Sequence, residues 1–207
     1  MLKLSLNTIE KRLLSCSVSI FTVDDFAKLL GISNKKAGLF LSRYSRKEDS
    51  RFFRLKKGIY AFSLLAPEKF EIANKLCQPS YVSFESALSY YNIIPETVYS
   101  ITSATTKRPN GFIAEKTNYE YYKLKRKLFF GYRLLKIRKS KVFIAEKEKA
   151  LLDHLYMASL GKKAVNKRID LSKIDKRKFK YYAGIFLKNI GKKSAFLLAV
   201  NNIARNI

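Results

Sequence analysis

The amino-terminal part of the fold is decided by residues 22–62, which read TVDDFAKLLGISNKKAGLFLSRYSRKEDSRFFRLKKGIYAF. Thr22 precedes two aspartates, which is typical of a helix start, because a hydroxyl caps free amide groups and carboxylates favour the positive end of the helix dipole. Gly31 follows the apolar positions of this helix and suits a left-handed cap, and Ser33 can cap a further helix. The stretch therefore predicts two helices joined by a tight turn.

The second helix of this pair has one apolar face. Ala37, Phe40, Leu41 and Tyr44 follow helical spacing and are expected to face the core. Two lysines in its first turn oppose the helix dipole, a cost that is tolerable where they meet phosphates. A solvated helix face is the alternative interpretation. The outward positions are Asn34, Lys35, Lys36, Leu39, Ser42, Arg43 and Arg46.

A short hairpin follows the helix pair. Residues 52–55 and 59–62 are expected to form strands joined at Lys56-Lys57-Gly58, where glycine can adopt a positive φ. The whole pattern predicts a winged helix-turn-helix with Arg54, Lys56 and Lys57 on the wing. A helix pair beside a positive ribbon fits a DNA groove and its flanking phosphates. We expect the cations of the helix and of the ribbon to protrude on a common side.

The charge of the chain also favours a polyanionic partner such as DNA. Its 207 residues include 42 Lys and Arg against 16 Asp and Glu, a formal net charge of +26, and 47% are hydrophobic. This composition indicates a globular protein with a polyanionic partner. A lysine-rich surface without a binding role is the alternative. Residues 159–207 are the most basic segment, with 13 basic and 2 acidic residues.

Several classes of protein are disfavoured by what the sequence contains. Cys16 and Cys77 stand apart, with no grouping that predicts a disulfide framework or a zinc site. The first residues lack the apolar core of a signal peptide, and the longest apolar stretches, such as residues 195–200, are too short for a membrane span. We expect a cytoplasmic protein without a membrane partner.

The remainder of the chain predicts an α+β domain. Ala66-Pro67-Glu68 breaks the preceding pattern, so we place a winged helix-turn-helix domain at residues 1–66 and an α+β domain with a basic helical end at residues 67–207. Alternating stretches suggest a small antiparallel sheet at residues 98–102, 119–124, 128–137 and 142–145. Helical spacing is expected at about 67–76, 83–91, 145–160, 176–189 and 193–205.

Catalytic chemistry has little support in the sequence. The single histidine, His154, is expected on a helix surface or in helix packing, and Glu146 and Glu148 suit the start of its helix. Neither a nucleophile turn nor a phosphate-cradling loop is present. We therefore expect no enzyme activity, no cofactor and no metal.

RNA binding is the second interpretation. Tyr119, Tyr121 and Tyr122 stand near a run of lysines and arginines, and aromatic rings among cations can stack on bases. Alternating aromatic residues on a strand more often face the core. Under this hypothesis the basic carboxy-terminal segment would protect a nucleic-acid target.

Four stretches carry a resemblance to a known family: residues 81–96 (YVSFESALSYYNIIPE), 101–108 (ITSATTKR), 129–132 (FFGY) and 144–153 (IAEKEKALLD). Together they resemble the AbiEi-type abortive-infection antitoxin family. The resemblance covers roughly residues 5 to 160 and leaves the last segment without a family motif. It implies a winged-helix domain fused to an antitoxin domain, autorepression through inverted repeats in the promoter, and neutralisation of a nucleotidyltransferase-like toxin without a stable complex, which is type IV behaviour.

The leading hypothesis is therefore an antitoxin that represses its own toxin–antitoxin operon by binding double-stranded DNA. Ser42 and Arg43 would approach base edges, Lys35, Lys36 and Arg46 the phosphates, and the wing the neighbouring groove.

Overall fold

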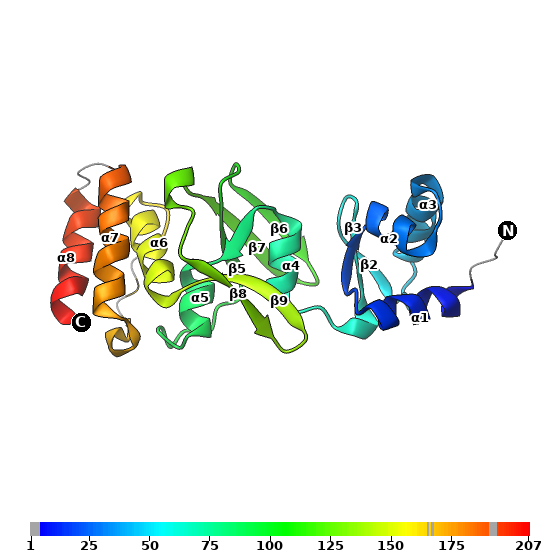
Figure 1. The fold of residues 1–207 in the computed structure, drawn as a ribbon, viewed down its shortest axis with the longest axis horizontal. Coiled ribbons are helices and arrows are strands. Elements are labelled where there is room, and N and C mark those ends of the chain that lie inside the picture. Colours follow the sequence, from blue (N-terminus) through cyan, green and yellow to red (C-terminus); the bar gives the residue numbers. More distant parts are fainter. Residues whose placement is uncertain (1–4, 165, 167, 191–193) are drawn as a thin grey trace.

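The computed structural model describes residues 5–164, 166, 168–190 and 194–207, and these form an α+β fold (Figure 1). The molecule is elongated, with the amino-terminal elements at one end, helices α7 and α8 at the other, and the larger sheet between them (Figure 1). Its three-stranded sheet has the order β1-β3-β2, and its six-stranded sheet has the order β6-β7-β5-β4-β9-β8.

The predicted pair of helices is confirmed. Thr22 and Asp25 form a capping box at the start of one helix, Gly31 ends it with a φ of 67°, and the Ser33 hydroxyl accepts a hydrogen bond from the Lys36 amide at 3.4 Å. Local capping therefore fixes both helices. The elements of this part are α1 (Leu6–Cys16), β1 (Ile20–Thr22), α2 (Val23–Leu30), α3 (Asn34–Tyr44), β2 (Phe52–Lys56) and β3 (Ile59–Phe62).

The three-stranded sheet is buried on both faces. One face contributes Phe52 and Phe62 to a core shared with α1, α2 and α3. The opposite face contributes Ile20, Leu55 and Ala61 to the core of the larger part. The ribbon therefore packs between two apolar cores, because alternate residues of each strand meet a different one. The domain boundary at residue 66 stays a prediction.

The larger part begins with the short 3-10 helix η1 (Ser63–Leu65), and its predicted helices are present. Among the described residues, none of the helices is both long and apolar enough to cross a membrane. Lys193, the expected first residue of the last helix, lies outside the described residues. The helices are α4 (Lys69–Leu76), α5 (Phe84–Tyr90), η2 (Arg126–Leu128), α6 (Lys147–Ser159), η3 (Leu171–Lys173), α7 (Lys176–Ile190) and α8 (Ser194–Asn206).

The prediction of a small antiparallel sheet is wrong. The sheet is mixed, because β4 pairs in parallel with β9, and β5 pairs in parallel with β7. Strand β4 has three buried residues and shows no alternation, and β6 begins with an Asn-Gly pair that favours a turn. The strands are β4 (Ser80–Val82), β5 (Ile101–Thr105), β6 (Asn110–Ala114), β7 (Thr117–Lys123), β8 (Tyr132–Ile137) and β9 (Ser140–Ala145).

A fully buried ion pair stands between this sheet and α6. Lys149 and Asp153 are one helical turn apart, and neither side chain is exposed. Asp153 also accepts hydrogen bonds from the Tyr81 hydroxyl at 3.0 Å and the Ser83 hydroxyl at 2.8 Å. Gly131, with a φ of 67°, lies so close that an added Cβ would come within 3.1 Å of the Lys149 side chain. The pair therefore joins β4, α6 and the segment before β8.

We predict that Lys149→Met lowers the free energy of unfolding by about 3–5 kcal/mol, because it leaves the Asp153 carboxylate buried without its counter-charge. Urea denaturation measures this loss. The control is Lys147→Met on the same helix, where the side chain is half-buried, and its cost should stay below about 1 kcal/mol. Equal losses in the two variants would contradict the prediction.

Candidate nucleic-acid interface

Helix α3 is held on the three-stranded sheet by aromatic packing. The Phe40 ring lies 5.6 Å from that of Phe26 and 5.7 Å from that of Phe52. Ala37 and Leu41 have no exposed surface. Because these residues fill one face of the helix, the opposite face is directed to solvent, as the helical spacing predicts.

That opposite face is cationic. Lys35, Lys36 and Arg43 of this face are exposed, as is Arg46 in the turn after α3, and within the described part of the chain none of these side chains has an ion-pair partner. In contrast, Asn34 donates a hydrogen bond to the Asp24 carboxylate at 3.4 Å. Ser42 is half-buried on the same helix, so its hydroxyl is less accessible than the neighbouring cations.

The hairpin contributes two of its three predicted cations to the surface. Arg54 is exposed on the sheet face that carries the helices, and Lys57 is exposed in the turn beside Gly58. Lys56 is instead directed into the molecule, where its ammonium donates to the Leu76 carbonyl and lies 5.1 Å from the centre of the Phe112 ring. Regular alternation along β2 would place the Lys56 side chain on the same face of the sheet as Arg54. The strand register shifts between these two residues, so Lys56 departs from that alternation.

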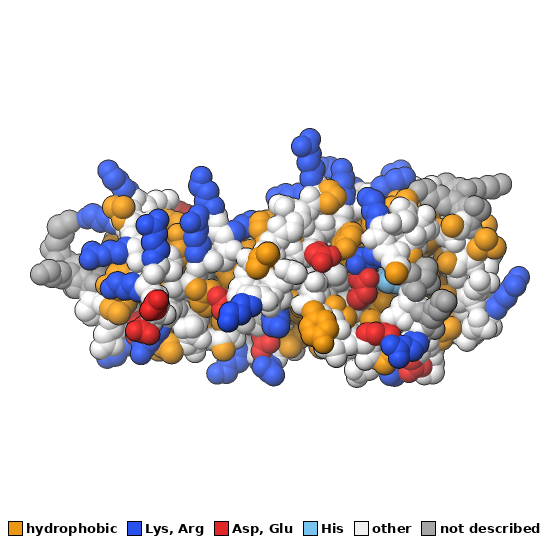
Figure 2. Space-filling model, turned by 180° about the vertical axis from the view of Figure 1, so that it is seen from behind, with side chains coloured by type: hydrophobic (Ala, Val, Ile, Leu, Met, Phe, Trp, Pro, Cys, Tyr) orange, Lys and Arg blue, Asp and Glu red, His pale blue; other side chains and the backbone are white. Residues whose placement is uncertain are grey.

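The exposed cations lie toward one edge of the molecule. In Figure 1, α3 and the turn between β2 and β3 are both at the upper end of the amino-terminal part. In the opposite view, Lys and Arg side chains protrude along the upper edge, and further ones lie on the face and along the lower edge (Figure 2). The surface seen in this view therefore carries more positive than negative side chains, which produces a positive potential.

Comparison with known proteins adds no family assignment. No protein-family model matches this chain, and no curated protein matches it.

The four stretches that carry the family resemblance converge on the buried ion pair. Tyr81 accepts a hydrogen bond from Lys149 at 2.8 Å, and Gly131 contacts the same lysine. The Thr102 hydroxyl donates to the Ser83 carbonyl at 2.8 Å. These residues build the core of the larger part, so the resemblance concerns core packing and does not define a surface site.

The tyrosines considered for base stacking are mainly core residues. Tyr119 and Tyr121 are buried, and the Tyr121 hydroxyl donates to the Ala73 carbonyl at 2.6 Å. Tyr122 is half-buried, with the Lys163 ammonium 4.1 Å from its ring centre. Their rings therefore do not form an open stacking surface.

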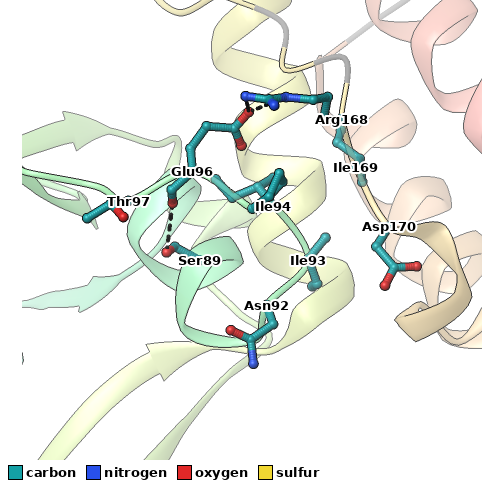
Figure 3. Close-up of a pocket in the computed structure, with 10 residues that line it drawn as sticks. Ser89, Asn92, Ile93, Ile94, Glu96, Thr97, Arg168, Ile169 and Asp170 are labelled. Atoms are coloured by element: carbon teal, nitrogen blue, oxygen red, sulfur yellow. Dashed lines mark hydrogen bonds and ion pairs between the residues drawn. The ribbon is translucent and has the colours of Figure 1, made fainter.

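A hollow of about 670 Å³ lies between the loop after α5 and the segment before η3. Figure 3 shows Glu96 and Arg168 directed toward one another at its edge. The Arg168 guanidinium donates to Glu96 at 2.9 Å, and Asp170 accepts from the Ser172 hydroxyl at 2.6 Å. The Ser89 hydroxyl donates to the Glu96 carbonyl at 3.1 Å.

His154 borders a second hollow, of about 480 Å³. Its ring is 1% exposed, which agrees with a packing role, and its Nδ1 lies 3.4 Å from a Glu85 oxygen. The other Glu85 oxygen accepts a hydrogen bond from Lys163 at 2.7 Å. Burial alone raises the pKa of Glu85, but His154 and Lys163 outweigh it and lower the pKa from 4.5 to about 2.

This low pKa predicts how stability depends on pH. The folded-state pKa is below the unfolded value, so the Glu85 carboxylate stabilises the protein above pH 4.5, and the contribution is lost as the pH falls toward 2. Glu85→Gln should lower the free energy of unfolding at pH 7 by at most about 3 kcal/mol, and the difference from wild type should vanish near pH 2.

Urea denaturation between pH 2 and pH 7 measures the effect. Glu48→Gln, which changes an exposed loop carboxylate, should leave the curve of stability against pH unchanged. A difference between Glu85→Gln and wild type that stays constant across this range would refute the assignment.

Proposed function

We propose that the amino-terminal elements form a winged helix-turn-helix and that the protein represses its own toxin–antitoxin operon. The order α1, β1, α2, α3, β2, β3 and the sheet order β1-β3-β2 support this proposal, because a winged helix places its hairpin beside a helix pair. In this arrangement α3 enters the major groove of duplex DNA.

One observation carries the proposal: the exposed face of α3 and the turn that follows it hold four cations without an ion-pair partner among the described residues. Neighbouring like charges repel one another, and phosphates relieve that repulsion while releasing counterions. The cations are Lys35, Lys36, Arg43 and Arg46. Arg43 also has the length and the donors to read a guanine edge.

The antitoxin role rests on the resemblance of the larger part. We infer from it that the protein counteracts a nucleotidyltransferase-like toxin without forming a stable complex, and that its operator contains inverted repeats. The stretches that carry the resemblance come together around Lys149 and Asp153, so in this chain they belong to one connected core.

Neighbouring lysines of the hairpin provide a matched test. Lys57→Ala should weaken binding to a duplex from the protein's own promoter and reduce the slope of log affinity against log salt by about 0.9, the value for one phosphate contact. Lys56→Ala should leave the slope unchanged, because its ammonium already contacts Leu76 and Phe112. Fluorescence anisotropy at several salt concentrations measures both slopes.

If Lys57→Ala leaves the slope at the wild-type value, the hairpin does not belong to the interface. Competition with transfer RNA separates the two nucleic-acid functions. A repressor should prefer the promoter duplex over both transfer RNA and a duplex with scrambled repeats, whereas an RNA-protecting protein should be displaced by transfer RNA.

Leu39 gives a second test on α3. Its side chain is 65% exposed among the cations of the helix, and an apolar residue in the major groove can contact the methyl group of thymine. Replacing operator thymines by uracil should weaken wild-type binding about fourfold for the contacted base, from about 0.8 kcal/mol per methyl group. Leu39→Ala should be insensitive to this replacement, and equal sensitivity in both proteins would exclude the contact.

A further inference from the structure

A large groove separates the β8–β9 hairpin from the segment that joins the two parts of the chain. Its volume is about 1350 Å³, and in Figure 1 the hairpin extends toward the connection after β3. Several of the apolar side chains that line it are exposed, including Leu134 at 51% and Phe143 at 42%. The apolar lining includes Leu14, Leu65, Tyr132, Leu134 and Phe143.

One wall of the groove is an edge strand. Strand β8 is the last in the order of the six-stranded sheet and pairs with β9 alone. Among the described residues, no backbone hydrogen bond is made by the outer side of Tyr132–Ile137. An edge of this kind presents amide and carbonyl groups at the spacing that an added strand requires.

The groove is also cationic. Lys136 of β8 and Lys141 of β9 occupy directly paired positions, where like charges destabilise a sheet. They line the groove together with Lys75 and Lys139, and in the described structure none of the four has an ion-pair partner. Glu71 is the acidic residue of the lining, and its oxygens accept from Ser19 and Ser140.

Two other occupants fit less well. A second copy of the chain would bring its own large positive charge, and lysines on an edge strand discourage pairing with an identical edge. Single-stranded nucleic acid would need free ring faces for stacking. The Tyr132 ring is already stacked on Tyr81 at 4.6 Å and meets the Phe143 ring edge-on at 5.9 Å.

We propose that this groove binds an extended, acidic segment of a partner protein, which adds to β8 as an outer strand. Alternate side chains of that segment would be apolar, packing on Leu134 and Phe143, and carboxylates would neutralise Lys136 and Lys141. This inference goes beyond the proposed repressor function and does not depend on DNA binding.

A displayed library of random twelve-residue peptides tests the proposal on the full-length protein. The wild type should enrich peptides in which acidic and apolar residues alternate. The variant Lys136→Glu/Lys141→Glu should enrich basic peptides and bind the best acidic peptide at least about tenfold more weakly. The control variant Lys35→Glu/Lys36→Glu has the same change of net charge on α3 and should retain the acidic selection.

Hydrogen exchange of the β8 amides locates the bound peptide, and exchange of these amides should slow in its presence. The proposal is overturned by peptides without an acidic bias, by no enrichment, by equal binding to the charge-reversed variant, or by unchanged β8 exchange. Displacement of the peptide by a twelve-residue uridine RNA would assign the groove to nucleic acid. Self-association of the protein that Leu134→Asp abolishes would assign it to a second copy.

Discussion

The structure depends on a sheet that packs against an apolar core on each of its two faces. Strands β1, β3 and β2 direct aromatic residues such as Phe52 and Phe62 into the helical core and smaller apolar residues such as Ala61 into the larger core. Because successive side chains of a strand point to opposite faces of the sheet, the same three hydrogen-bonded strands contribute residues to both cores. The position of α3 relative to the six-stranded sheet is consequently set by packing and not by a linker.

This constraint explains which cations face solvent. Lys56 is close to Arg54 and Lys57 in sequence, but the shifted register turns it toward the larger part, where a carbonyl and an aromatic ring surround its ammonium. The remaining cations of the hairpin and of α3 lack such partners among the described residues. A surface that repels itself in the free protein is suited to a polyanion, and this supports the proposed DNA interface.

Much of the secondary structure could be predicted because its signals are local. Thr22, Gly31 and Ser33 mark helix ends through contacts with residues a few positions away. The parallel pairing of β4 with β9 could not be predicted, since it joins residues far apart in sequence and β4 is too short to show a period. The groove beside β8 could not be predicted for the same reason, since residues far apart in sequence, such as Leu14 and Leu134, line it together.

Gly131 connects the interior of the larger part with its periphery. The absence of a side chain lets the backbone pass directly over Lys149, and the next residue is the first of the outermost strand. A fully buried charge and the first residue of an edge strand are thus neighbours of the same glycine. Any side chain at this position would have to displace the lysine or the start of the strand, because protein interiors are close-packed.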